Sequence, residues 1–218
     1  MSHNTKMPEG LLPLFPLELV LFPHTPLPLH IFEDRYREMI NECLTLEREF
    51  GVVLARGNGV LRTGCTASIE QLLERHSDGR MDILTLGRRR FEIESIDTQR
   101  TFYRAEVRYF EDDEFTPAAS SDILRARQHH REVLLLTDSE LDEPDLDHPN
   151  LSFLLAQVSP DLNFKQTLLQ VRSEAERMTL VADHLQNLVI RQKTKIAMKQ
   201  VSRSNGHGKH LPDLSSLN

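Results

Sequence analysis

The chain has 218 residues, of which 39% are hydrophobic and 27% are charged, and its formal net charge at pH 7 is −7. This length suits one large domain or two small ones with a well-buried core. The acidic balance argues against a general affinity for nucleic acid or for anionic membranes.

The segment LPLFPLELVLFPHTPLPLHIF, residues 12–32, is strongly apolar but contains five prolines. A membrane-spanning helix needs about 20 apolar residues without so many helix breakers. The first ten residues contain a single lysine, so they do not form the basic start of a signal peptide. We therefore expect a cytoplasmic protein without membrane contact.

Two short strands and a helix are predicted over this opening. Residues 11–15 and 17–22 are predicted as strands separated by a proline, and residues 23–32 as an extended, largely buried connection. A helix is expected from residue 33 or 34 onward, because apolar residues then follow at helical spacing.

Residues 50–110 alternate apolar and polar side chains, which is typical of strands. Ser77, Asp78 and Gly79 are predicted to form a hairpin turn, because Asp-Gly adopts positive φ at low cost. In FEIESI, residues 91–96, one slip in the alternation is consistent with a β-bulge. About six such strands predict a small barrel or two crossed sheets.

Helical periodicity begins after residue 117 and predicts helices over 123–136, 151–158 and about 165–200. The last helix carries apolar residues every three or four positions. This repeat fits packing within a helical bundle, and it is also compatible with contact to a partner or with a homodimer. Residues 201–218 are predicted to form a disordered tail.

Catalytic and metal-binding motifs are absent from the sequence, which contains no P-loop, G-x-S-x-G or H-E-x-x-H motif. His129 and His130 are adjacent on a predicted helix and point about 100° apart, which suits no shared metal ion. Cys43 and Cys65 have no partner at metal-ligand spacing and are expected to be buried free thiols. We predict no catalytic residue, no metal and no cofactor.

Residues 88–90, three consecutive arginines, are the densest basic run of the strand region. A phosphate contact is one interpretation of such a run. Asp82, Glu92 and Glu94 lie nearby in the sequence and offset its charge. We therefore expect arginines that are solvated or paired in salt bridges.

Glu33, Arg35 and Tyr36 cluster where the first helix is expected to begin. A half-buried guanidinium needs partners for its donors. We therefore expect Arg35 to reach backbone carbonyls or an acid and to tie this helix to the strands. The prediction for all three residues is a structural role.

The stretch LPLFPLELVLFPHTPLPLHIFEDRY closely resembles the opening of the N-terminal, substrate-binding domain of the Lon ATP-dependent proteases. GCTASIEQ, DGRMDILTLGRRRF and LSFLLAQ…KQTLLQ…ERMTLVADHL match that family in the same order, over about residues 11–188. The resemblance implies an α+β fold, with a PUA-like β pseudobarrel over 8–116 and an α-helical bundle with a long last helix over 117–200. The chain differs at His24, where the family usually has glycine, and a positive φ there would strain histidine.

The ATPase and peptidase modules of full Lon proteases have no counterpart in this sequence, so the resemblance extends only to the recognition domain. It implies a stand-alone, non-catalytic member that is not an enzyme. Such a domain is expected to bind unfolded or apolar polypeptide, or a protein partner such as a separate protease. Phe22, His24, Leu27 and Arg89 are the candidate binding residues.

Two alternatives remain open. PUA-like barrels in other families bind RNA, which requires a clustered basic face with interleaved aromatic residues. The acidic composition argues against nucleic acid as the partner. A small enzyme in a cleft between barrel and helices is the other alternative, although no motif supports it.

Overall fold

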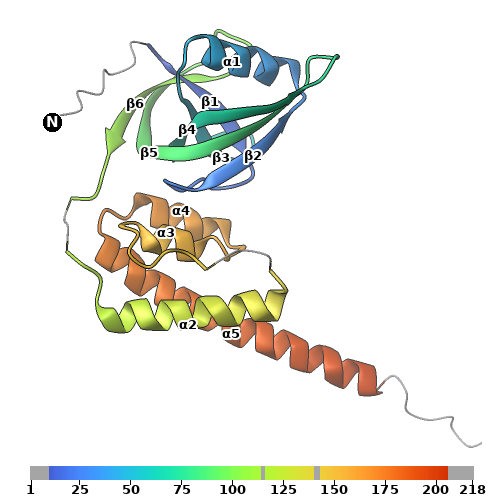
Figure 1. Ribbon diagram of the computed structural model, residues 1–218, viewed down its shortest axis with the longest axis vertical. Coiled ribbons are helices and arrows are strands. Elements are labelled where there is room, and N and C mark those ends of the chain that lie inside the picture. The colour runs from blue at the N-terminus through green and yellow to red at the C-terminus, as the bar shows by residue number, and fades with distance from the viewer. Residues whose placement is uncertain (1–9, 114–115, 140–142, 206–218) are drawn as a thin grey trace, which may run out of the picture.

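The computed structural model describes residues 10–113, 116–139 and 143–205. Strands fill the first half of the chain and helices the second, so the α+β expectation is confirmed (Figure 1). In chain order the elements are β1 (Leu12–Leu17), β2 (Pro26–Ile31), α1 (Asp34–Thr45), β3 (Phe50–Arg56), β4 (Gly59–Arg75), β5 (Met81–Asp97), β6 (Arg104–Phe110), α2 (Ser120–Thr137), α3 (Leu151–Ala156), α4 (Leu162–Gln170) and α5 (Glu174–Asn205).

Five of the six strands close into a barrel. β1 pairs with β3 in parallel and with β6 in antiparallel orientation, while β5 pairs with both β4 and β6. Strands β4 and β5 are each 17 residues long and shift register repeatedly, which lets them bend around the closed sheet. One such shift lies between Ile93 and Ser95 and confirms the bulge predicted in residues 91–96.

The start of the chain differs from its prediction. A single strand, β1, includes both Pro13 and Pro16, and residues 18–25 form no strand. Leu21 and Phe22 are buried from this bend, at 4% and 2% exposure. Leu21 and Phe22 are apolar because they insert into the core. A short apolar run in the sequence does not distinguish such a buried bend from a buried strand.

Strand β2 replaces the connection that was expected to be largely buried, and three of its six residues, Pro26, Pro28 and His30, are exposed. It pairs only with β5 among the described residues, so it is an edge strand. The Gly87 amide donates to the Thr25 carbonyl at 2.9 Å, which turns the odd-numbered residues toward β5. Pro26 and Pro28 therefore face the open side, where they remove two amide donors from the edge.

The β4–β5 hairpin extends past the barrel beside α1 (Figure 1). Its turn contains the predicted Ser77, Asp78 and Gly79, and Gly79 has a φ of 89°. The Arg37 guanidinium of α1 donates to the Asp78 carbonyl. The turn is therefore held from outside the hairpin.

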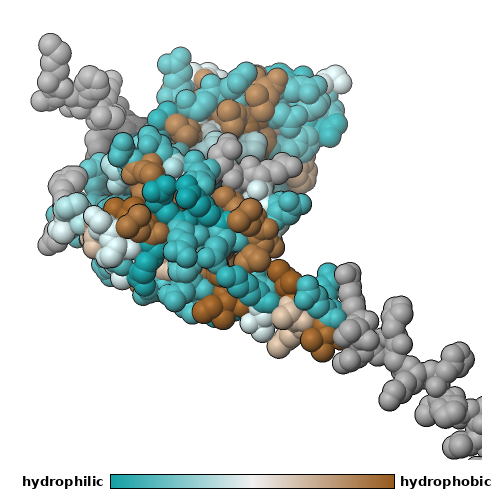
Figure 2. Space-filling model, turned by 60° about the horizontal axis from the view of Figure 1, so that its bottom comes forward, coloured by the Kyte–Doolittle hydropathy of each residue, from teal (hydrophilic) through white to brown (hydrophobic). Residues whose placement is uncertain are grey.

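The long helix expected from residue 165 is two helices, α4 and α5, with a break at residues 171–173. The buried apolar side chains of α5 end at Val189, and beyond it Ile190, Met198 and Val201 are each more than half exposed. Figure 2 shows apolar side chains along this protruding end of α5. The homodimer remains a prediction. α5 continues to Asn205, inside the range predicted as a tail, and residues 206–218 lie outside the described part.

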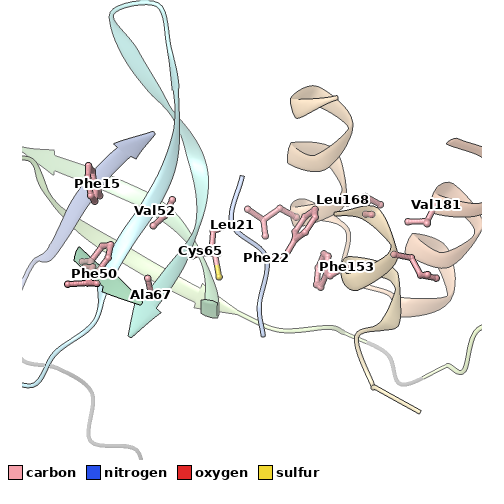
Figure 3. Packing of buried hydrophobic residues seen from close by; sticks show 14 of the residues in the cluster. Phe15, Leu21, Phe22, Phe50, Val52, Cys65, Ala67, Phe153, Leu168 and Val181 are labelled. Atoms are coloured by element: carbon pink, nitrogen blue, oxygen red, sulfur yellow. The ribbon is translucent and has the colours of Figure 1, made fainter. Parts of the chain in front are cut away.

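The larger of two apolar core clusters runs from the barrel into the helices (Figure 3), and the smaller one lies among barrel strands around Leu14 and Phe91. Phe22 of the bend stacks on Phe153 of α3, with ring centroids 4.8 Å apart. Cys43 and Cys65 are buried free thiols, as predicted, and burial raises their pKa values to about 11 and about 12. Within the described residues, no helix combines the length and apolar character needed to cross a membrane.

Gly87 allows the bend before β2 to approach β5. A Cβ placed on Gly87 would lie 2.0 Å from the Phe22 carbonyl oxygen, whereas one on Gly59 would meet no described atom within 4 Å. We expect Gly87→Ala to lower the free energy of unfolding by about 1–3 kcal/mol, as overpacking does. Gly59→Ala is the matched control and should change it by less than about 0.5 kcal/mol. Urea unfolding compares the two variants, and equal effects would contradict the close-approach argument.

Candidate functional site

A cavity of about 410 Å³ opens where the end of the barrel meets the helices. It is lined by Pro23, His24, Arg88, Arg89, Arg90, Tyr109, Phe110, Glu111, Asp112, Thr116, Pro117, Pro149, Asn150, Phe153 and Glu174. An adjoining hollow of about 710 Å³ shares His24, Arg88, Arg89 and Glu111 with it. This second hollow continues along the C-terminal end of α1 to Leu44 and Ile69. We call the two together the groove.

His24 lies where the two hollows meet. It has a φ of 60°, so the loop does adopt the left-handed conformation that glycine favours. Its amide donates to the Gly87 carbonyl at 2.8 Å, which holds the backbone in place. Partial burial, and then the charges of His148 and Arg88, lower the pKa of His24. The exposed imidazole is therefore neutral at neutral pH and can both donate and accept a hydrogen bond.

The arginines of β5 are paired with acids. Arg88 donates to the carboxylate of Glu70 at 2.7 Å, and Arg89 lies 3.1 Å from Glu49. The Arg89 guanidinium also stacks 4.1 Å from the ring centre of Tyr109. The expected salt bridges are present, but their acids come from β4 and the α1–β3 connection. Asp82, Glu92 and Glu94 were expected to offset the positive charge of this run. They pair with His30, His76 and Arg108 instead.

Arg177, at the start of α5, is fully buried at 0% exposure. Its two terminal nitrogens donate to both carboxylate oxygens of Asp112 at 2.6 Å, and one also donates to the Val171 carbonyl at 2.8 Å. The remaining donors reach Glu174 at 2.8 Å and the Ser152 hydroxyl at 3.1 Å. All five N–H donors of this guanidinium thus have an acceptor, which a buried arginine requires.

Arg90 connects the barrel to the same cluster. It is 5% exposed and donates to Asp112 and to the Val171 carbonyl, the latter at 2.6 Å. Burial raises the pKa of Asp112, but hydrogen bonds and charge from Arg177 and then Arg90 outweigh it, so this pKa lies below its ordinary value. The carboxylate is therefore ionised between two buried guanidinium groups. We call Arg90, Asp112, Glu174 and Arg177 the junction network.

The geometry of a closed barrel, a helical region and a groove between them matches a known family. The model of the ATP-dependent protease La (LON) substrate-binding domain matches residues 11–187. The chain belongs to this family.

Two solved structures are similar to this Lon-type domain. The crystal structure of a Lon N-terminal domain protein from Xanthomonas campestris has a TM-score of 0.64 and 26% identity, covering 78% of this chain and 95% of its own. The N-terminal domain of the Mycobacterium avium complex Lon protease has a TM-score of 0.58 and 16% identity, covering 81% and 98%. At that identity the second likeness concerns the fold alone.

The groove brings together two of the four candidate binding residues of this Lon-type domain, His24 and Arg89. Phe22 lies behind the groove in the core, and Leu27 is a half-buried residue of edge strand β2. Neither lines the two hollows.

Glu33, Arg35 and Tyr36 lie together at the start of α1, away from the groove residues. Arg35 donates to Glu33 at 2.9 Å and stacks over Tyr36 at 4.5 Å. The contact with the barrel is made by Tyr36, whose ring packs 4.2 Å from that of Phe15 in β1. Arg35 thus reaches an acid, as expected, but the contact that ties α1 to the barrel is made by Tyr36.

Sequence reasoning did not identify the junction network. One signal was available, because Arg177 lies next to Met178 and four residues before Val181, on the apolar face of α5. A charged residue in such a face is rarely buried without a partner. Asp112 carried no comparable signal, since it lies in an acidic run beside Asp113.

Asp112→Asn tests the junction network. The asparagine keeps the size of the side chain but leaves two buried guanidinium groups without their shared charge. We expect the free energy of unfolding to fall by about 3–5 kcal/mol. Asp113→Asn is the matched control, because Asp113 is 67% exposed and pairs loosely with Arg172 at 3.3 Å. It should cost less than about 1 kcal/mol. Urea unfolding of both variants is the measurement, and equal losses would contradict the assignment.

The lowered pKa of Asp112 also predicts how acid acts on this contribution. The pKa of Asp112 is lower in the folded protein than its ordinary value of 3.8. The ionised carboxylate therefore contributes its full stability above pH 3.8, and this contribution is lost as the pH falls through the folded-state pKa. The stability difference between the wild type and Asp112→Asn should therefore be constant down to about pH 5 and shrink below about pH 4. Urea unfolding across this range measures it. Protonation of the other carboxylates lowers the free energy of unfolding of both proteins alike. A stability difference that stays the same in strong acid would therefore contradict this prediction.

Proposed function

We propose that this Lon-type domain binds extended segments of unfolded polypeptide in the groove. The observation that supports this most is the continuity of the two hollows, which share His24, Arg88, Arg89 and Glu111. A continuous channel suits a chain segment better than a compact ligand. Family membership over residues 11–187 agrees with a substrate-recognition role.

The groove offers both apolar and hydrogen-bonding surface. Tyr109, Phe110 and Pro149 line the cavity between barrel and helices, which we call the deeper hollow. Leu44 and Ile69 line the adjoining one along α1, which we call the outer hollow. Apolar side chains of a client lie against these residues in the proposed complex. His24 and the Arg88 and Arg89 guanidinium groups supply donors at the boundary between the hollows, within reach of backbone carbonyls of a bound segment.

Strand addition at the barrel edge is a less suitable mode of binding. Extended peptides commonly add a strand to an open sheet edge through main-chain hydrogen bonds. Two of the amide donors that such a peptide needs are missing on β2, at Pro26 and Pro28. Recognition is therefore proposed to rest on side chains in the groove.

The charge of the groove favours polypeptide over RNA. An RNA site needs basic side chains that are free to bind phosphates. The charges of Arg88 and Arg89 are each balanced by a glutamate, and Glu111 adds a further negative charge to the lining, so the groove lacks the excess positive charge that phosphates need, whereas guanidinium N–H groups can still donate to neutral carbonyls. We propose a protein client, held in the groove without chemical change and passed to a separate protease.

The proposal predicts salt-tolerant binding of an unfolded polypeptide. Fluorescence anisotropy of a labelled, reduced and carboxymethylated lactalbumin, with single-stranded RNA in parallel, should show binding of the polypeptide alone. Arg89→Gln should weaken it by about tenfold, the worth of one charge-assisted hydrogen bond.

Arg108→Gln is the matched control for this measurement. It makes the same change of charge at a side chain that is 58% exposed, pairs with Glu92 and does not line the groove. Its affinity should stay within about twofold of the wild type. Equal weakening by both variants would contradict binding in the groove. Salt-sensitive binding of RNA alone would contradict the proposed client.

A further inference from the structure

A cluster of two histidines and an aspartate lies on the barrel, away from the groove. His30 is in edge strand β2, Asp82 is its direct partner in β5, and His76 lies between β4 and β5. Sequence spacing gave no sign of this cluster, since 46 residues separate the two histidines. The pairing of β2 with β5 and the hairpin turn bring the three side chains together.

The Asp82 carboxylate lies between the two imidazoles. One of its oxygens is 2.6 Å from Nδ1 of His30, and the other is 2.8 Å from Nε2 of His76. A carboxylate only accepts, so each of these nitrogens donates. The two imidazole nitrogens thus lie on either side of one carboxylate, and each is bonded to a different oxygen of it.

We propose that His30, His76 and Asp82 bind a divalent transition-metal ion, with Zn²⁺ as the best match. Their ligand atoms all lie within 4.8 Å of one another. In a tetrahedral zinc site, bonds of about 2.0–2.1 Å place ligand atoms about 3.3 Å apart. The separations of 2.6 Å and 2.8 Å then need to widen by less than about 1 Å, and the widest separation among the three ligand atoms, at most 4.8 Å, needs to narrow by up to about 1.5 Å. Side-chain rotation provides this without moving the paired strands.

The donor set decides which ions fit. Imidazole nitrogens select zinc, copper or nickel, whereas magnesium and calcium require sites built mainly from oxygen. On metal binding, the proton on Nδ1 of His30 and that on Nε2 of His76 move through solvent to the other ring nitrogen. The freed lone pairs then coordinate the ion. Three protein ligands leave a fourth position open to water or to a group from a partner.

The surroundings favour a preorganised site. The Glu74 carboxylate lies 3.4 Å from Nδ1 of His76, on the side away from the metal position. A carboxylate in that place orients an imidazole ligand and strengthens it. The ring of Phe32 lies beside His30, with centroids 6.0 Å apart.

The consequence of metal binding is a bond between edge strand β2 and the β4–β5 hairpin. An ion that binds the folded chain alone stabilises it by mass action. Addition of Zn²⁺ should therefore raise the melting temperature, and magnesium should not.

Calorimetric titration of the untagged, EDTA-stripped chain with zinc chloride tests the site. We expect one ion per chain, with a dissociation constant in the micromolar range or tighter. His30→Gln and His76→Gln should each weaken binding at least tenfold, as should Asp82→Asn. His30 is 46% exposed, so its replacement preserves the fold, which thermal unfolding without metal verifies. The visible spectrum of the Co²⁺ complex should have the intensity of a four-coordinate ion.

His207→Gln with His210→Gln is the control for incidental binding by the two histidines near the C-terminus of the sequence. This double variant should bind as tightly as the wild type. Loss of binding in it, with binding intact in His30→Gln, would overturn the proposal. Absence of binding by the wild type at micromolar zinc would also overturn it.

Discussion

The arrangement of barrel and helices depends on the buried charge of Arg177. A guanidinium at 0% exposure is tolerated only when every donor is satisfied, and its acceptors come from the end of the barrel, α3, α5 and the residues before α5. The break between α4 and α5 contributes one of these acceptors. The Val171 carbonyl accepts from both Arg90 and Arg177 because it is free of a helical hydrogen bond.

The same contacts that join the two parts also shape the groove. Arg90, Asp112 and Glu174 line its deeper hollow, and Phe153 lies beneath the Arg177 guanidinium at 4.4 Å. The stack of Phe22 on Phe153 adds an apolar connection next to the ionic one. Both walls of the proposed binding site therefore share one core and one ion network, so the groove is built into the fold.

Much of the fold followed from local pattern, because hairpin turns, alternation and helical periodicity are properties of short segments. The turn at Gly79 and the bulge after Ile93 were predicted in this way. The α4–α5 break was not, since the apolar residues keep their helical spacing across it. Of the candidate binding residues only His24 and Arg89 line the groove, and Asp112 was not among the candidates because it is distinguished from its acidic neighbour solely by tertiary contacts.

The two outward-facing prolines of β2 have a consequence for the proposed binding of unfolded clients. An unfolded client carries β-prone segments that seek an open sheet edge, and a receptor with such an edge would be drawn into the growing aggregate. Pro26 and Pro28 withhold the amide donors on which that templating depends. In the proposed role, the domain can thus bind aggregation-prone chains without pairing with them through this sheet edge.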